Sequence, residues 1–499
     1  MEKNVLEWLE ASAAAYPEKT VYEDMEESIT FGELMEEARR IGSALLEREL
    51  SEKPVAVMMK RSVHTIAAFL GIVYSGHAYA PIDSAQPKSR IDKILKLLSP
   101  ELLITDGAGT EDDKAYGVTD IGTLREHEID GEGLEGVRIR MTETDPLYVI
   151  FTSGSSGNPK GVLTSHHSLM CYITAYTRMM GINGEDRLCS QSPLDYIAAV
   201  RDIYVPLLAG AYDCLCPKEY FMQPGALFDL LNEKRISCIG WSTSALCVLS
   251  KLNAFRESRP EHLKKICFSG SVMPPAVLKE WLEQLPGAFF VNQYGPTEAT
   301  ASCTYYKIDR DKMPEGAIPI GVPYDGYRVF LLSDEGKRVQ TGELGEICVS
   351  GPILALGYYN DRERTDEAFV QNPLNDAYHE LIYKTGDIGR YREDGILEFH
   401  GRRDRQIKHM GHRVELDEIE SAAYSSGKVE AASAVYDQAK EVIWLFYTGE
   451  AEMKELITGL RGSIPGFMVP RRVKKLDEMP RLANGKTDVK TLERMADEA

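Results

Sequence analysis

The hydrophobic and polar positions of the chain follow two patterns that together predict a layered α/β fold. Apolar residues recur at helical spacing in many segments, as Val5, Leu6 and Leu9 do near the start. Between these segments lie short apolar runs rich in β-forming residues. We predict strands at residues 54–58, 148–151, 211–216, 236–239 and 289–292. Strands that alternate with helices are typical of largely parallel sheets covered by helices.

The pattern changes after Asp309. Short apolar runs then alternate with turns rich in Gly, Pro and Asp, and we predict strands at 327–332, 345–350 and 395–400. This alternation of short apolar runs and turns predicts a small, more antiparallel, β-barrel-like portion within the same large domain.

A second change, at residues 401–406, predicts a domain boundary. This stretch is polar and charged, and new α+β patterning follows it. Residues 415–423 carry apolar positions on one helical face and acidic residues near the start, where the helix dipole favours them. We predict a large N-terminal domain, residues 1–402, joined by a hinge to a small α+β domain, residues 403–499.

Composition limits the classes of function. A chain of 499 residues exceeds the size of one hydrophobic core, and 43% hydrophobic with 27% charged residues is usual for a globular enzyme. The formal net charge of −20 opposes nucleic-acid or anionic-membrane binding, because both need a basic surface. We see neither a signal-peptide pattern nor an apolar run of membrane-spanning length. We expect a cytoplasmic protein without membrane insertion.

The nine cysteines are scattered along the sequence, and Cys214 and Cys216 are the closest pair. No spacing matches a zinc site, and an odd number fits reduced thiols better than a disulfide framework. We predict that all nine are buried as small apolar side chains.

Residues 148–161 form the most informative motif, Tyr-Val-Ile-Phe-Thr-Ser-Gly-Ser-Ser-Gly-Asn-Pro-Lys-Gly. An apolar strand enters a loop of hydroxyls, glycines and one lysine, where backbone N–H groups, hydroxyls and an ammonium can converge on phosphate. A Gly-Lys-Ser/Thr ending is absent, so this is not a Walker P-loop. Taken alone, a flexible Ser/Gly loop is an equally good interpretation.

Further motifs follow in the sequence. They are Asn-Gln-Tyr-Gly-Pro-Thr-Glu-Ala at 292–299, Gly-Glu-Leu-Gly-Glu at 342–346, Gly-Tyr-Tyr at 357–359, Tyr-Lys-Thr-Gly-Asp at 383–387, Gly-Arg-Arg-Asp-Arg-Gln-Ile-Lys at 401–408 and Asn-Gly-Lys at 484–486. With the 152–161 loop and His166, they resemble in order the motifs of the adenylate-forming superfamily. This superfamily includes acyl-CoA synthetases, luciferases and peptide-synthetase adenylation domains.

The resemblance covers essentially the whole chain and implies an enzyme that uses ATP and Mg²⁺. It implies activation of a small carboxylic acid as acyl-AMP, release of pyrophosphate and transfer of the acyl group to a thiol. The implied catalytic residues are Thr152, Lys160, Glu298 and Lys486. The implied nucleotide-binding residues are Ser153, Gly154, Ser155, Ser156, Gly157, Asn292, Tyr294, Gly295, Thr297, Asp387 and Arg402.

The implied roles make physical sense. Tyr294 offers an aromatic face for adenine, and the Glu298 carboxylate is a hard oxygen ligand for Mg²⁺. Asp387 can accept hydrogen bonds from the ribose hydroxyls, with Arg402 beside it. Lys486 would offset the charge that develops where the acid attacks the α-phosphate.

Residues 404–420 most resemble the amino-acid-activating branch, namely peptide-synthetase adenylation domains and D-alanine–carrier protein ligases. The resemblance implies a hinge at Asp404 and a thiol route near residues 411–413. The sequence ends 13 residues after Lys486, so we expect the phosphopantetheine thiol of a separate carrier protein as acceptor. An acid–CoA ligase of the same fold is the alternative. A non-catalytic binding protein that kept the fold is a further alternative, which the intact motif residues disfavour.

The acid pocket departs from the amino-acid-activating pattern. A gapless alignment of residues 187–202 puts Ile197 where those enzymes carry the aspartate that binds the substrate α-ammonium. A buried ammonium without a partner costs at least ~1–3 kcal/mol, so we expect an acid without a free α-ammonium. The alignment also assigns Ala198, Arg201, Gly240, Cys267, Ser269, Gln293, Ala301 and Ser302 to the pocket.

Two charged residues near this position have alternative interpretations. The Arg201 guanidinium suits a second anionic group on the acid, and an ion pair with Asp202 or another nearby acid is an equally good interpretation. Asp195 would face the same side as Ile197 if the segment is a strand, and it could then meet an amine displaced from the α position. An N-cap of the following helix is the alternative for Asp195.

Overall fold

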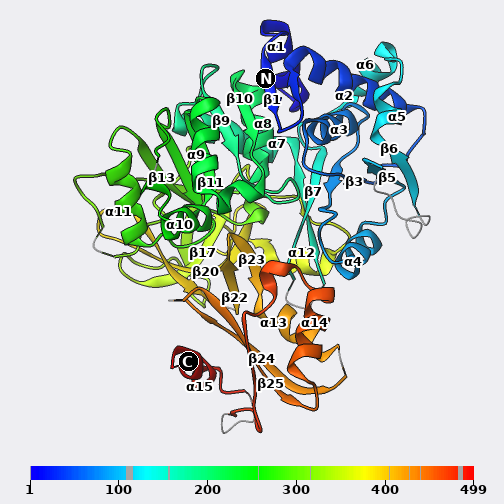
Figure 1. Ribbon diagram of the computed structural model, residues 1–499. Helices are drawn as coiled ribbons and strands as arrows, with labels where there is room; N and C mark the ends of the chain where they lie inside the picture. The colour runs from blue at the N-terminus through cyan, green and yellow to red at the C-terminus, as the bar shows by residue number, and fades with distance from the viewer. Residues whose placement is uncertain are drawn as a thin grey trace. The chain divides into compact units, whose positions relative to one another are not determined.

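The structure is a computed structural model. It describes residues 2–107, 116–154, 158–256, 258–314, 316–403, 405–425, 427–438, 440–481 and 487–498 (Figure 1). The chain folds into two compact units. Unit 1 comprises Met1–Asp83, Leu98–Ile150 and Gly161–Gly401, and unit 2 comprises Ser84–Leu97, Phe151–Lys160 and Arg402–Ala499. The domain division proposed between residues 402 and 403 stays a prediction.

The largest sheet of unit 1 has nine strands in the order β15-β14-β13-β12-β11-β9-β10-β1-β2. Strands β13 to β1 of this order pair in parallel, whereas β15, β14 and β2 pair antiparallel. The bounds are β1 Thr20–Glu23, β2 Ser28–Thr30, β9 Arg187–Ser190, β10 Tyr212–Leu215, β11 Cys238–Ser242, β12 Lys265–Ser269, β13 Phe289–Tyr294, β14 Thr304–Lys307 and β15 Val322–Pro323. This sheet confirms the predicted layered, mainly parallel architecture.

A second sheet has seven strands in the order β18-β8-β7-β4-β3-β5-β6. Its strands are β3 Val55–Met58, β4 Tyr79–Pro81, β5 Leu102–Thr105, β6 Gly117–Asp120, β7 Pro146–Thr152, β8 Lys160–Ser165 and β18 Gly357–Tyr358. The predicted barrel-like portion is a five-stranded sheet in which β16, β17, β20 and β19 pair antiparallel in that order. It consists of β16 Arg328–Leu332, β17 Leu344–Ser350, β19 Phe369–Gln371, β20 Leu381–Tyr391 and β21 Leu397–Arg402.

Helices separate the strands, as the apolar spacing predicts. Up to residue 401 they are α1 Leu6–Ala15, α2 Phe31–Leu46, α3 Val63–Tyr74, α4 Lys88–Leu98, α5 Ile121–Arg125, α6 Gly131–Arg140, α7 His166–Met180, α8 Ala199–Ala209, α9 Pro224–Glu233, α10 Thr243–Lys251, α11 Pro275–Gln284 and α12 Arg362–Ala368. Short 3₁₀ turns occur at η2 Lys218–Met222, η3 Ala254–Arg256 and η4 Thr297–Ala299. Local chemistry fixes the ends of α7, because the Ser165 hydroxyl accepts from the Ser168 N–H and Gly181 adopts φ 63° at the C-terminus.

The C-terminal part of unit 2 is a small α+β fold. It contains the two-stranded sheet β22 Gln406–His409 and β23 His412–Glu415, and the three-stranded sheet β24 Val429–Asp437, β25 Val442–Gly449 and β26 Arg472–Lys475. The helices are α13 Leu416–Tyr424, α14 Met453–Ser463, η5 Gly466–Met468 and α15 Val489–Asp497. Ile419, Leu445 and Met468 are buried in its core. The predicted helix at 415–423 is confirmed as α13.

Within the described part of the chain, no helix combines the length and apolar character needed to cross a membrane.

Candidate active site

Two motifs that lie far apart in the sequence meet in unit 1. Tyr294 ends β13, and its hydroxyl donates a hydrogen bond to the Asp387 carboxylate on β20, 93 residues later. Both side chains are buried, and burial together with Asp387 raises the pKa of Tyr294 well above its usual value. The Tyr294 hydroxyl therefore remains a donor. Nearby, the Asn292 amide donates to the Pro319 carbonyl at 2.8 Å, which fixes the strand before Tyr294.

The loop after β13 folds back tightly on itself. A Cβ on Gly295 would lie 2.4 Å from the Ser302 Cα, so only glycine permits this approach. Thr297 and Glu298 follow on η4, and both are buried. One Glu298 carboxylate oxygen accepts a hydrogen bond of 2.7 Å from the Tyr358 hydroxyl. Tyr358 therefore fixes the orientation of this buried carboxylate, a role the sequence did not indicate.

The donor set suits a metal that is bound mainly through substrate. Among the described residues, no group of three or more His, Cys, Asp or Glu side chains is arranged to hold a metal ion. Mg²⁺ that is bound through nucleotide phosphates usually takes only one or two protein carboxylates. The single buried carboxylate of Glu298 fits that requirement.

The predicted phosphate loop begins where β7 ends. Thr152 is buried, and its hydroxyl oxygen has no hydrogen-bond partner among the residues that the structure describes. The Ser153 hydroxyl donates to the Arg413 carbonyl at 2.8 Å, and Gly154 is buried. Lys160 opens β8 and is half-buried. An orphaned buried hydroxyl fits a loop that receives a polar ligand, because such groups are otherwise hydrogen-bonded in proteins.

The structure describes only some of the other residues that were predicted for the nucleotide site, the hinge and catalysis. Arg402 ends β21 and is half-buried. Five predicted residues lie outside the described part of the chain: Ser155, Ser156, Gly157, Asp404 and Lys486.

Five predicted acid-pocket residues are joined through one guanidinium. Arg201 lies in the first turn of α8 and is 2% exposed. Its Nη1 donates to the Gln293 Oε1 at 2.8 Å and approaches the Cys267 Sγ at 3.8 Å. Its Nη2 donates to the Gly240 carbonyl at 3.2 Å, and its Nε to the Ala198 carbonyl at 3.4 Å. The pocket residues from β11, β12, β13 and α8 thus form one connected cluster.

The alternative ion pair between Arg201 and Asp202 is not formed. No ion pair between these two residues exists within the described part of the chain, because consecutive helical residues do not face each other. Burial raises the pKa of Asp202 to about 7, although Arg201 and Arg61 act to lower it.

The structure contradicts the strand and the N-cap that were predicted around Asp195, whereas its place in the acid pocket stays a prediction. The segment before α8 is a series of turns rather than a strand, with hydrogen bonds from the Tyr196 N–H to Pro193 and from the Ala199 N–H to Tyr196. The N-cap of α8 is Ala198, which has no side chain to cap with. Asp195 is half-buried in these turns, whereas Ile197 is buried.

The remaining predicted pocket residues lie on or near the same strands. Ser269 is the register partner of Gln293 in β12 and β13. Ala301 and Ser302 follow η4, and Ala301 adopts φ 70°. None of these three residues forms a hydrogen bond with the Arg201 side chain within the described chain. Their place in an acid pocket stays a prediction.

Sequence reasoning missed three tyrosines around the guanidinium. The Gln293 amide donates to the Tyr324 hydroxyl, and the Arg201 Cζ lies 5.7 Å from the centre of the Tyr176 ring. Tyr172 is fully buried and interacts with Arg201. Tyr172 and Tyr176 lie four residues apart on α7, so helical spacing was the available signal for these two.

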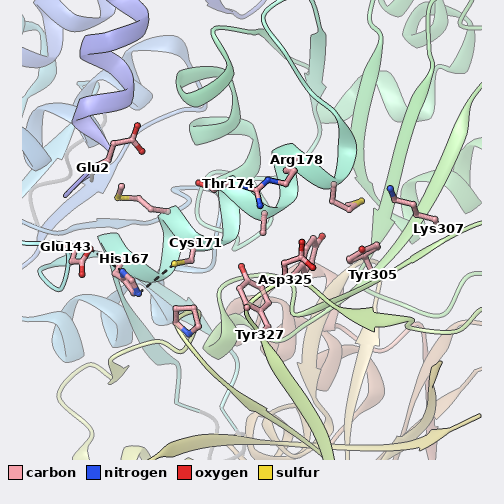
Figure 2. Close-up of a pocket in the computed structure, with 16 residues that line it drawn as sticks. Glu2, Glu143, His167, Cys171, Thr174, Arg178, Tyr305, Lys307, Asp325 and Tyr327 are labelled. Carbon is pink, nitrogen blue, oxygen red and sulfur yellow. Dashed lines mark hydrogen bonds and ion pairs between the residues drawn. The ribbon is translucent and has the colours of Figure 1, made fainter. Parts of the chain in front are cut away.

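A separate cavity of about 500 Å³ opens between α7 and the strands β14 and β15 (Figure 2). The Cys171 Sγ lies 3.8 Å from the His167 Nε2, and the His167 Nδ1 lies 3.5 Å from a Glu143 carboxylate oxygen. Tyr327 also lines this cavity, and its buried hydroxyl has no hydrogen-bond partner among the described residues. Nothing in the sequence distinguished this cavity.

Cys171 corrects the prediction that all nine cysteines are buried. Eight are buried, whereas Cys171 is half-exposed at the cavity wall, on the outer side of α7. Burial and the nearby Glu143 raise the pKa of Cys171, so the thiol is mostly protonated at neutral pH.

We expect the native protein to react with 5,5′-dithiobis(2-nitrobenzoate) at one thiol, more slowly than a free cysteine does, because only the thiolate attacks. Cys171→Ser should remove this reaction, and Cys247→Ser, which changes a buried thiol, should not. Denatured protein should titrate all nine thiols. Several rapidly reacting thiols in the native protein would contradict the burial pattern.

Comparisons with known proteins agree with this geometry. Residues 9–359 match the family model described as AMP-binding enzyme. Zwittermicin A synthase ZmaJ of Bacillus cereus is 31% identical over 93% of the chain and 90% of that protein. The D-alanine–D-alanyl carrier protein ligase of Bacillus licheniformis is 29% identical over 98% of both chains. The solved structure of an NRPS protein containing adenylation and PCP domains superposes with a TM-score of 0.84 at 25% identity, covering 99% of the chain and 84% of that structure.

Several similar proteins are much longer. The chain spans 45% of tyrocidine synthase 1 of Brevibacillus parabrevis, to which it is 29% identical over 98% of its own length.

Proposed function

The chain belongs to the AMP-binding enzyme family, and from this premise we propose that it is an AMP-forming acid–thiol ligase. It joins a small carboxylic acid to AMP with release of pyrophosphate, and then transfers the acyl group to a thiol with release of AMP. One observation carries the proposal. Motif residues 93 positions apart, Tyr294 and Asp387, are hydrogen-bonded to each other in unit 1.

Adenosine would bind at this pair. The Asp387 carboxylate accepts the ribose hydroxyls, and the Tyr294 ring packs against adenine. Asn292, Gly295 and Thr297 shape the surrounding loop. Arg402 is the further residue that we propose for the ribose.

The phosphates would bind at the Ser/Gly loop. The Thr152 hydroxyl supports this role, because it is buried without a hydrogen-bond partner in the described chain. Lys160 supplies a positive charge at the end of the loop, and Ser153 to Gly157 supply backbone N–H groups and hydroxyls. Glu298 would contribute the one protein carboxylate of a Mg²⁺ site, and Mg²⁺ offsets phosphate charge when it is bound.

The nucleotide products test the reaction class. Incubation with ATP, Mg²⁺, an acid and a thiol acceptor should yield AMP and pyrophosphate in equal amounts, together with the thioester. ADP or inorganic phosphate as the primary product would contradict the proposal.

A separate carrier protein with a phosphopantetheine arm is the acceptor that we propose. The match to a D-alanyl carrier protein ligase over 98% of both chains supports it. CoA is the alternative acceptor. Parallel assays with CoA and with phosphopantetheinylated carrier proteins separate the two, because only the true acceptor supports rapid thioester formation.

Strand β26 offers a basic surface for such a carrier. Carrier proteins of this kind are usually acidic, and a chain of net charge −20 would repel one without a local basic patch. Arg472, Lys474 and Lys475 on β26 are exposed, and Arg471 precedes them. Arg405 does not belong to this patch, because it pairs with Asp417 at 2.8 Å and Glu420 at 2.7 Å.

Reversing Arg471 and Arg472 to Glu should slow transfer to the carrier, more strongly at low salt, and leave pyrophosphate exchange unchanged. Lys454→Glu with Arg461→Glu is the matched control, because both residues are exposed on α14 and the change in charge is equal. A loss that is independent of salt would contradict electrostatic docking.

A further inference from the structure

Arg201 carries a buried positive charge that forms no ion pair with a described carboxylate. The side chain is 2% exposed, and an arginine guanidinium stays protonated in proteins. Its hydrogen-bond acceptors are the Gln293 amide oxygen and the Gly240 and Ala198 carbonyls, all of which are neutral. Among the described residues, no carboxylate forms an ion pair with it. Burying a charge without an ion pair costs free energy in any protein, and an anionic ligand bound to Arg201 would offset that cost.

The neighbouring acids do not supply that anion. Asp202 follows Arg201 on α8 but forms no ion pair with it within the described chain. Burial raises the pKa of the Asp202 carboxyl, whereas Arg201 and Arg61 act to lower it. Asp213 is fully buried beside Asp202, and burial also raises its pKa. Arg61 acts on both carboxyls, and Arg201 acts on Asp202 without forming an ion pair with it.

A second orphaned group lies next to the guanidinium. The Tyr172 side chain is fully buried and interacts electrostatically with Arg201. Its hydroxyl makes no hydrogen bond of normal geometry among the described residues, although Ser302 and Arg201 lie close enough to lower its pKa. Burial raises the pKa of Tyr172 to about 12, so the hydroxyl is a donor at neutral pH. An unfilled donor and an unpaired cation at one place fit the same anionic ligand.

Three further residues surround Arg201, and none of them carries a charge that could neutralise it. Cys267 approaches Nη1 at 3.8 Å and is a weak acceptor, which a carboxylate oxygen would replace favourably. Gly240 has no side chain, and a Cβ there would lie 3.7 Å from the guanidinium carbon. Ile197 provides no negative charge nearby for an ammonium.

We propose that the activated acid carries a second carboxylate, and that this carboxylate binds Arg201 and accepts a hydrogen bond from Tyr172. The substrate class is therefore a small dicarboxylic acid, of which one carboxylate is adenylated. This inference rests on the proposed function and specifies its substrate.

Matched substrates test the proposal. Acid-dependent ATP–pyrophosphate exchange is measured with straight-chain dicarboxylic acids of four to six carbons, and with the monoamide of each. The monoamide has nearly the same size and lacks only the second charge. The best dicarboxylic acid should exceed its monoamide in kcat/KM on the order of 10- to 100-fold, the range expected for a charge-assisted hydrogen bond.

Gln293→Glu is the sharpest variant. It keeps Arg201 and places a carboxylate at the acceptor position 2.8 Å from Nη1, so the protein supplies its own counter-ion. The variant should fold, because it pairs a buried charge rather than exposing one. The preference for the dicarboxylic acid over its monoamide should fall at least tenfold.

Arg201→Met should reduce the same preference by removing the charge. Arg310→Met is the matched control, because Arg310 also donates to backbone carbonyls, those of Leu282, Leu285 and Ala288, and no contact joins it to Arg201 in the described chain. The control should keep the wild-type preference. Thermal unfolding of each variant shows whether it is folded.

The outcomes separate this inference from the proposed function. If no acid of any class supports exchange, the proposed function is wrong. If monoamides or other neutral acids work as well as dicarboxylic acids, the proposed function stands and the second carboxylate is rejected. An unchanged preference in folded Gln293→Glu would also reject it.

Discussion

Lys486→Ala should lower adenylate formation by about two to three orders of magnitude, the usual loss when a preorganised charge-stabilising group is removed. The residue lies outside the described part of the chain, and its proposed role comes from the Asn-Gly-Lys motif. Negative charge builds up where the acid attacks the α-phosphate, and the Lys486 ammonium would offset it. In the transfer step the thiol attacks the acyl carbon and AMP departs, so no group attacks the α-phosphate. Transfer of the acyl group from a supplied acyl-adenylate should therefore remain largely intact.

Two assays on the same protein separate these steps. Pyrophosphate exchange reports adenylation, and single-turnover reaction of synthetic acyl-adenylate with the thiol acceptor reports transfer. Lys490→Ala is the control, since it removes an exposed lysine of α15 only four residues away. Equal losses of Lys486→Ala in adenylation and in transfer would contradict the proposal that Lys486 acts only in adenylation.

Asp404→Pro should impair thioester formation on the order of 10²-fold while adenylation changes little. We propose that residue 404 is the hinge between the N-terminal domain, 1–402, and the C-terminal domain, 403–499. A hinge residue absorbs the φ and ψ changes of the motion, and proline fixes φ near −65°. A domain that stops short of its second position misplaces the acceptor, and a misplacement of about 1 Å already costs about 10²-fold.

Asp404→Ala is the matched control. It removes the carboxylate and leaves the backbone free to rotate, so thioester formation should stay close to that of the wild type. If Asp404→Ala is as defective as Asp404→Pro, the side chain and not the backbone motion is responsible. Unchanged thioester formation in Asp404→Pro would exclude residue 404 as the hinge.

Most of the fold could be predicted from local patterns, because buried strands and amphipathic helices leave strong periodic signals. The run 289–292 became β13, and 327–332 became β16. The run 236–239 was placed too early, because β11 spans Cys238–Ser242. Pairing with β12 sets that position, since Gly240 and Ser242 oppose Cys267 and Ser269 in register. A partner strand is invisible in a local window, which explains the shift.

The site was predictable where motifs encode it and unpredictable where contacts are long-range. Tyr294 and Asp387 were found separately by motif, but their hydrogen bond depends on the packing of β13 and β20. Arg201 was singled out as a pocket residue, whereas its partner Gln293 lies 92 residues later on another strand. The strand and the N-cap predicted around Asp195 were wrong, because neither a period-2 pattern nor a capping pattern applies to a series of turns. Such turns are set by tertiary packing rather than by local propensity.

The measurement that tests the account most directly is ATP–pyrophosphate exchange by the wild-type enzyme over α-amino, β-amino, hydroxy, keto, aryl and dicarboxylic acids. Our account predicts exchange that requires both an acid and Mg²⁺, with a dicarboxylic acid the best substrate and common α-amino acids poor ones. Absence of exchange with every acid, in protein shown to be folded by thermal unfolding, would contradict the central claim that this chain forms acyl-adenylates.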